Sequence, residues 1–453
     1  MNPRGLCWLV SACLSLVPFV SHAADVAAPT VLADSTVVER WTLDNGLQVT
    51  TRHIPGARTV AMVLGFRVGS DLDPVGQEGI AQLMAELLLT APAGSTPART
   101  ASEMNHLRPE GWDLQAGPHF TMLTEIAQGP QVAGVLSQFA SRLRGVTVTQ
   151  TELKTAVESV RSDLAQRYFG PPGQSLYYQV RELGLHTDDQ ITLRKANAKG
   201  IEKVSVKQAQ ERLRQLYVPA NAVLSIVGDL DEMQLHALIQ SQFGDIRAGT
   251  PGPALAPSPL QPYARVIKRT DLTSPIGVIA VISPPVTDPN HPVFYLGVTL
   301  LGGLAKDLWQ KTDLLPSRFR YSLFSDPDLV LYYPETDGHD QDTDVMGVRF
   351  SQLIVRLRSS LVDEEAYRKL RESLRWQLGG PLSRRFLERA RTESATLGTL
   401  ASTLAARSLW LGEPFWQGYL ARLDAEPSGA FDRISQYVDS REHQVRLLFH
   451  PGR

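Results

Sequence analysis

Hydrophobic and polar residues along the first part of the chain predict an ordered series of strands and helices. Two short strands are expected within residues 38–52, around an Asn45-Gly46 turn, because this dipeptide favours tight hairpins. Good helix formers fill residues 79–89, and Gly244 follows a predicted helix over 231–243 as a natural stop. The other elements expected here are strands over 59–68 and 222–227 and helices over 132–144, 152–168 and 206–217.

A similar order returns after a stretch rich in proline and glycine. Six of the residues in 251–262 are Pro or Gly, so we expect an interdomain linker over 251–263. The elements predicted after it are strands over 274–283, within 321–333 and over 444–449, and helices over 292–301, 364–377 and 383–406. The pattern therefore predicts an α+β fold of two similar halves, 39–250 and 264–453, each an antiparallel-rich sheet packed with helices.

The N-terminus has the composition of a secretory signal. Arg4 precedes a mostly apolar stretch over 5–20, and Ser21-His22-Ala23 offers small residues for cleavage before Ala24. We expect a signal peptide over 1–23 and a flexible leader over 24–38, hence an exported protein, periplasmic if the source is a Gram-negative bacterium. A retained membrane anchor and a lipoprotein anchored at Cys13, within Val10-Ser11-Ala12-Cys13, are the alternatives.

The amino-acid composition limits the functional groups and the partners that the chain can use. The chain has 453 residues, of which 43% are hydrophobic and 20% charged, with a net charge of −2 and no charged block that favours nucleic acid. Both cysteines, Cys7 and Cys13, lie in the predicted signal peptide. The mature chain would therefore have no disulfide, thiolate nucleophile or cysteine metal ligand. No later segment is predicted to cross a membrane.

Several short motifs together resemble the insulinase-type (pitrilysin-like, inverted-zincin) zinc peptidases. They occur in the order expected for that family over roughly residues 39–450: LDNGLQV at 43–49, VGS at 68–70, DP at 73–74, GIA at 79–81, YVPANAVL at 217–224, VGD at 227–229, FGD at 243–245 and LGG at 301–303. The resemblance implies the peptidase fold over nearly the whole predicted mature chain.

Active members of this family carry H-x-x-E-H on the helix after the Gly-x-Ala motif. Two His four residues apart face the same zinc ion, and the Glu polarises the attacking water. Here the three positions hold Gln82, Ala85 and Glu86. The resemblance makes Glu158 the counterpart of the distal Glu ligand. Only ligand-like Glu86 and Glu158 would remain, so we expect neither a catalytic residue nor bound zinc in this chain.

The second half of such peptidases contributes an Arg and a Tyr that hold the substrate at the zinc. In the matching segments Asp307 takes the place of the Arg, with Lys306 beside it as a second source of charge, and Tyr321 is retained. A half-buried strand tyrosine is the alternative for Tyr321. The Asp337–Asp342 loop has cation-binding residue types, but its polar, Gly-containing character favours a solvated acidic loop.

Three functions follow from these residues. In the first, favoured by the resemblance, the chain is a non-catalytic subunit that pairs with an active insulinase-type homologue, which holds the zinc, to enclose a peptide-binding chamber. In the second, the chain is a free-standing peptide- or protein-binding scaffold. In the third, it is an active metallopeptidase with an atypical site built from Gln82, Glu86 and Glu158.

Overall fold

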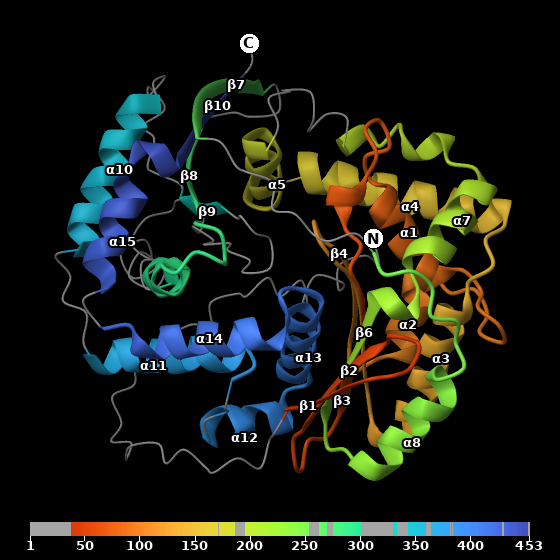
Figure 1. Cartoon of the computed structure of the whole chain (residues 1–453). Coiled ribbons are helices and arrows are strands. Elements are labelled where there is room, and N and C mark those ends of the chain that lie inside the picture. Colours follow the sequence, from red (N-terminus) through yellow and green to blue (C-terminus); the bar gives the residue numbers. More distant parts are fainter. Residues whose placement is uncertain are drawn as a thin grey trace.

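The computed structural model has a mixed α+β architecture, rich in helices, around two sheets (Figure 1). It describes residues 38–170, 172–185, 195–252, 262–269, 275–299, 329–332, 343–358, 364–380, 382, 384–427 and 430–451. Within these ranges, no helix combines the length and the apolar character needed to span a bilayer.

The first sheet has six strands in the order β1-β2-β6-β3-β5-β4. All neighbours pair antiparallel except β2 and β6, which are parallel. Every residue of β3, β5 and β6 is buried, because helices cover both faces of the sheet centre. The strands are β1 (Val38–Thr42), β2 (Gln48–His53), β3 (Val60–Phe66), β4 (Trp112–Ala116), β5 (Thr121–Ala127) and β6 (Ala222–Gly228).

Most helices from the first part of the chain pack on one face of this sheet. They share a core with Met62, Leu64 and Leu224 of the central strands. Capping boxes at Thr100, Thr149 and Ser205 start three of the surrounding helices, each with Glu or Gln three residues later. The helices of this part are α1 (Ile80–Thr90), α2 (Ala101–Leu107), α3 (Val132–Arg144), α4 (Gln150–Phe169), α5 (Pro172–Leu185), α7 (Val206–Leu216) and α8 (Glu232–Phe243).

The second sheet has the order β7-β10-β8-β9 among the described strands. Its pairing repeats that of β2-β6-β3-β5: a parallel pair formed by the first and last strands, followed by two antiparallel pairs. The strands are β7 (Tyr263–Arg269), β8 (Ile276–Ile282), β9 (Leu329–Tyr332) and β10 (Gln444–Pro451). Strands β1 and β7 each begin one residue before the predicted domain starts.

The described structure also contains five short 3-10 turns and six further helices. The turns are η1 (Ser70–Leu72), η2 (Gly129–Gln131), η3 (Ile201–Lys203), η4 (Pro219–Asn221) and η5 (Arg441–His443). The further helices are α10 (Thr343–Arg358), α11 (Glu364–Gln377), α12 (Arg384–Thr392), α13 (Ser394–Leu409), α14 (Gly412–Ala425) and α15 (Ala430–Asp439). Residues 291–299 are also helical.

Each sheet is covered by a helix from the other part of the chain. Helix α13 lies across the face of the first sheet opposite α1, while α5 packs against the second sheet (Figure 1). Leu176, Val180 and Leu183 of α5 share a buried cluster with β8 and β10. The sequence analysis predicted two halves, each packed with its own helices. In the structure the two parts interlock, because each sheet is also covered by a helix from the other part.

Small side chains allow α13 to approach the first sheet closely. Hydroxyl pairs join Thr59 to Ser394 at 3.1 Å, Thr50 to Ser408 at 3.2 Å and Thr124 to Ser402 at 3.4 Å. Gly398 faces the sheet, and a Cβ atom there would lie 3.2 Å from Cδ1 of Ile126. The run of Ser, Thr, Ala and Gly in α13 is therefore a surface that packs closely on the sheet.

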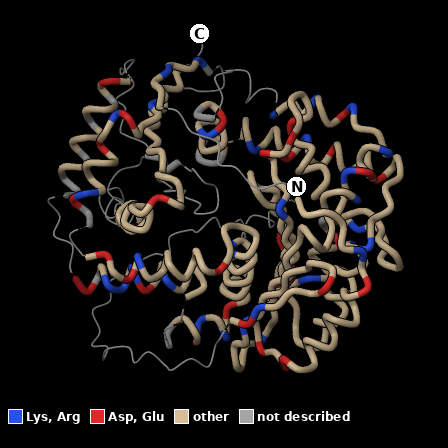
Figure 2. The backbone as a smooth tube through the Cα atoms, viewed as in Figure 1, with Lys and Arg blue, Asp and Glu red and all other residues tan. Residues whose placement is uncertain are grey.

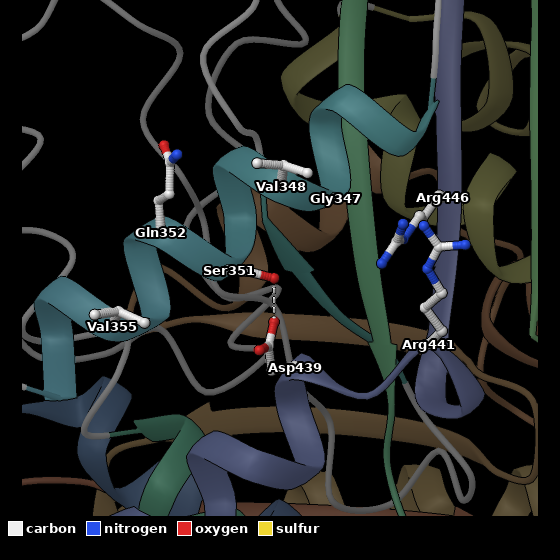
Figure 3. A pocket seen from close by; sticks show the side chains of 8 residues that line it. All are labelled: Gly347, Val348, Ser351, Gln352, Val355, Asp439, Arg441 and Arg446. Carbon is white, nitrogen blue, oxygen red and sulfur yellow. Dashed lines mark hydrogen bonds between the residues drawn. The ribbon is translucent and has the colours of Figure 1, made fainter.

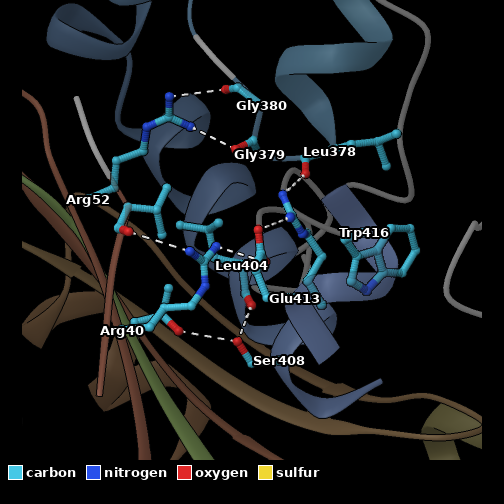
Figure 4. Close-up of polar contacts among 12 residues, drawn as sticks. Arg40, Arg52, Leu378, Gly379, Gly380, Leu404, Ser408, Glu413 and Trp416 are labelled. Atoms are coloured by element: carbon cyan, nitrogen blue, oxygen red, sulfur yellow. Dashed lines mark hydrogen bonds and ion pairs between the residues drawn. The ribbon is translucent and has the colours of Figure 1, made fainter. Parts of the chain in front are cut away.

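Buried arginines strengthen the same interface (Figure 4). The Arg52 guanidinium on β2 donates to the carbonyls of Gly379 at 3.4 Å and Gly380 at 3.0 Å. Glu413 accepts from Arg407 at 2.6 Å and pairs with Arg40 of β1 at 2.9 Å. Arg407 is 2% exposed, so this carboxylate compensates a charge that is almost removed from water.

We predict that Gly398→Leu lowers the free energy of unfolding by about 1–3 kcal/mol, because the added side chain must separate α13 from the sheet. Chemical denaturation measures the effect. Gly418→Leu is the matched control: Gly418 also lies in a helix, but a Cβ there meets no atom within 4 Å. Equal stability of the two variants would contradict close packing at Gly398.

We also predict that Glu413→Ala lowers the free energy of unfolding by about 3 kcal/mol, since it leaves the Arg407 guanidinium buried without its carboxylate. Glu365→Ala removes one of the two carboxylate partners of Arg368 on the surface of α11, and a much smaller loss is expected, because water screens this exposed pair. A Glu413→Ala variant as stable as Glu365→Ala would show that Arg407 does not depend on this carboxylate.

Candidate functional site

Helix α1 carries the three positions at which the sequence lacks the zinc motif. It begins after Gly79, whose φ of 95° is a left-handed conformation that favours glycine. A Cβ at Gly79 would also lie only 2.8 Å from Cδ1 of Leu164. The Asp73 carboxylate accepts hydrogen bonds from the amides of Gly79 at 2.7 Å and Ala81 at 2.9 Å. Asp73 therefore fixes the start of the helix, where a negative charge is favourable.

The three motif positions have different environments. Gln82 is partly exposed, while Ala85 is fully buried in the core. The Glu86 carboxylate accepts a hydrogen bond from the Ser159 hydroxyl of α4, and Asp163 of the same helix adds negative charge nearby. Burial raises the pKa of Glu86, and Asp163 raises it further, against the lowering effect of Ser159. No side chain at position 85 can accept a proton from water.

The sequence analysis named Glu86 and Glu158 as the remaining ligand-like residues, and they lie in different surroundings. Glu158 is exposed on α4, whereas Ser159 and Asp163 are the residues of this helix that act on Glu86. Ser159 and Asp163 are four apart and so share one helix face. Leu153, Ala156 and Val160 are buried and mark the inner side of α4. The spacing of these apolar residues in the sequence could have identified Ser159 and Asp163 as residues that border this side.

A small polar pocket lies beside Gln82. Its volume is about 30 Å³, and its lining includes Asp73, Arg167, Tyr168 and Lys195. The Lys195 ammonium contacts Glu182 of α5 at 2.7 Å, and these side chains are only 14% and 5% exposed. The Tyr168 hydroxyl donates to the other oxygen of Glu182 at 3.1 Å. Sequence reasoning missed this cluster, because α4, α5 and the loop before α1 converge only in the folded chain.

The charge of Asp73 is also affected by this pocket. Burial raises the pKa of Asp73 to about 6 from its usual 3.8, although two backbone amides and the cations Lys195 and Arg212 favour the charged form. Arg212 donates to the carbonyl of Leu72 at 2.9 Å and is thereby held beside the same loop. The entrance of α1 is therefore an ionised network rather than an apolar contact.

The zinc ion that the family resemblance implies does not fit these residues. Position 82 offers a neutral amide, position 85 a methyl group, and position 86 a carboxylate already bonded to Ser159. In the described ranges, no three or more His, Cys, Asp or Glu side chains are arranged to hold a metal ion. The pocket beside Gln82 instead contains the cationic side chains of Arg167 and Lys195.

A larger groove of about 510 Å³ lies in the second part of the chain, between α10 and α15 (Figure 3). It is lined by Val348 and Val355, which are exposed, and by Arg441 and Arg446. Asp344 pairs with both arginines, at 2.9 and 3.5 Å, and Ser351 binds Asp439 at 2.5 Å. Residues of both charge signs are likewise interspersed along the described backbone (Figure 2).

Strand β4, one of the two edge strands of the first sheet, lies next to α1. All five of its residues are half-buried, and its only described strand neighbour is β5. Burial raises the pKa of Asp113 on this strand to about 6, and a 2.7 Å hydrogen bond from Gln115 opposes the shift. Among the described residues, no strand pairs with the other edge of β4.

Several sequence predictions lie outside the described residues. They are the signal peptide with Cys7 and Cys13, residues 24–37 of the leader, the substrate-holding candidates Lys306, Asp307 and Tyr321, and the Asp337–Asp342 loop.

We predict that stability falls as pH rises from about 4 to 6, partly through Asp73. Its pKa is higher in the folded chain than in the unfolded chain, so the folded state binds the proton more tightly and loses this advantage on ionisation. Asp73→Asn should flatten this part of the profile, measured by urea unfolding at several pH values. Asp231→Asn, at the cap of α8, controls for losing a capping carboxylate; an unchanged slope in Asp73→Asn would contradict the assignment.

Comparisons with known proteins agree with this architecture. Residues 203–394 match the family model described as the peptidase M16 inactive domain. No curated protein sequence matches the chain significantly. Among solved structures, a protease from Helicobacter pylori has 14% identity and a TM-score of 0.71, and the match covers 92% of this chain and 100% of that one.

Two further structures extend the comparison. A putative M16-like peptidase from Alicyclobacillus acidocaldarius has 16% identity and a TM-score of 0.66, covering 93% of this chain and 100% of that one. The periplasmic protease PqqL from Escherichia coli has 14% identity and a TM-score of 0.63, covering 92% of this chain but 48% of PqqL. At these identities the likeness to solved structures is one of fold. Together with the inactive domain matched over residues 203–394, it is consistent with a non-catalytic member of the insulinase-type (M16) peptidases, and the H-x-x-E-H motif is absent from this sequence.

Proposed function

We propose that the chain is an exported, non-catalytic subunit that pairs with an active insulinase-type peptidase and forms part of its peptide-binding chamber. One observation carries the proposal: the helix that holds the zinc motif in active members presents Gln82, a fully buried Ala85 and Glu86. The scaffold is retained while the proton acceptor is absent, which favours a role other than hydrolysis. The zinc would belong to the partner.

The repeated strand pairing supports a duplicated plan of two similar halves. Four strands of each sheet share the same order of parallel and antiparallel neighbours. The halves would meet through the exchanged helices α5 and α13, which give this chain a firm chamber wall. The export signal over residues 1–23 would place the chain outside the cytoplasm, in the periplasm of a Gram-negative source.

Peptide binding would use the edge of β4 that has no strand partner among the described residues. An extended peptide can add to such an edge through main-chain hydrogen bonds, with alternate side chains directed to each face. Trp112 and Leu114 of β4 pack against the core that contains α1, whereas Asp113 and Gln115 point to the opposite face. A bound peptide would therefore lie within reach of the α1 site.

We predict a one-to-one complex when the chain is mixed with a homologue from the same genome that has an intact H-x-x-E-H motif. Size-exclusion chromatography with light scattering measures the complex, and a quenched peptide assay measures hydrolysis. The chain alone should release no product, with or without added zinc, because no base stands at position 85.

The homologue with its motif Glu changed to Gln serves as the control, since it should pair but not hydrolyse. If the chain remains monomeric with every such homologue yet binds peptide, it is a free-standing scaffold. Zinc-dependent hydrolysis by the pure chain that is lost in Glu86→Gln would establish an atypical active peptidase.

A further inference from the structure

The pocket beside Gln82 contains a cation supplied by the chain itself. The Lys195 ammonium is held by Glu182 at 2.7 Å and lines the same pocket as Gln82, at the position of the first zinc ligand of active members. Asp73 is close enough for Lys195 to stabilise its charged form. A single ammonium thus acts on carboxylates from the loop before α1 and from α5.

Because the pocket is small, the Lys195 ammonium acts at short range on any ion that enters it. A volume of about 30 Å³ has room for about one water molecule, so the charged groups in its lining lie close together. Arg167 adds a second cationic side chain, with its guanidinium carbon 5.2 Å from the ring centroid of Tyr178. A divalent cation entering this space would be repelled by both groups, although the Asp73 carboxylate also lines the pocket.

The ammonium is firmly positioned. Glu182 is 5% exposed and also accepts from the Tyr168 hydroxyl at 3.1 Å, and the Gln179 amide donates to the Tyr168 carbonyl. Moving Lys195 away would remove a 2.7 Å ionic contact from the buried Glu182 carboxylate, which is unfavourable. The lysine therefore cannot yield its place to a metal at little cost.

We propose that Lys195, anchored by Glu182, replaces the metal of the family's active site with a fixed internal ammonium that excludes zinc and links the loop before α1 to α5. The inference rests on the proposed non-catalytic role of this site. It goes further in stating that restoring the lost histidines would not be sufficient to restore zinc binding.

The test uses the full mature chain with Gln82→His and Glu86→His, which returns two imidazoles and keeps Ala85, so that no charge enters the core. Added zinc is the probe. Zinc per chain is measured by elemental analysis after dialysis, and affinity by competition with a chromophoric chelator. Circular dichroism checks the fold of each variant.

Adding Lys195→Met to the double-histidine chain should tighten zinc binding at least tenfold, roughly the effect of about 1.4 kcal/mol of relieved repulsion. Lys195→Arg, which keeps the charge, should not. Lys154→Met is the matched control, because it removes an exposed lysine from α4 with the same change in net charge. Equal zinc affinity with and without Lys195→Met would overturn the proposal.

The wild-type background gives a second test that does not depend on the histidines. Lys195→Met alone should lower the equilibrium constant for folding at least about tenfold relative to Lys154→Met, whereas Lys195→Arg should restore most of it. An unchanged folding constant would overturn the proposed link. Complex formation with the active homologue is measured separately. A failed zinc test would therefore not contradict the proposed pairing, and a failure to pair would not contradict the zinc result.

Discussion

The contact between α13 and the first sheet is the constraint on which the rest of the structure depends. A helix covers a sheet closely only if its facing side chains are small, and α13 meets this requirement with Gly398 and its hydroxyl residues. Because α13 comes from the second part of the chain, the first sheet cannot bury both faces without it. The reciprocal contact of α5 with β8 and β10 imposes the same dependence in the other direction.

This interlocking explains why so many charged groups are buried between the two parts. Arg52 donates to the carbonyls of Gly379 and Gly380, and Arg407 is compensated by Glu413, in a region from which water is largely excluded. Buried ion pairs add little net stability, but they penalise any arrangement that separates the partners. They therefore favour one fixed relation between the sheets, which suits a chain whose proposed role is to form a wall.

The α1 site follows the same physical logic at a smaller scale. The loop before α1, α4 and α5 meet around ionised groups, and each charge finds its counterpart on another element. As proposed above, this chain has Lys195 and Glu182 in place of the metal that active members of the family use. The loss of the motif is thus accompanied by a different and internally satisfied network.

The sequence determined much of the local structure. Turn signals such as Asn45-Gly46, helix stops such as Gly244 and the alternation of apolar residues predicted most described elements within a few residues, because these signals act between near neighbours. The order of motifs and the substitutions at Gln82, Ala85 and Glu86 also indicated the family and the missing zinc motif.

Only the tertiary structure decided which distant groups meet. No short-range pattern shows that α13 covers the first sheet, that Ser159 and Asp163 rather than Glu158 act on Glu86, or that Lys195 lies beside Gln82. These contacts join residues far apart in the chain, and they are selected by the burial of whole faces and by the need to compensate buried charge. Local propensity does not encode either condition, so the residues of the site were only partly visible before the chain was folded.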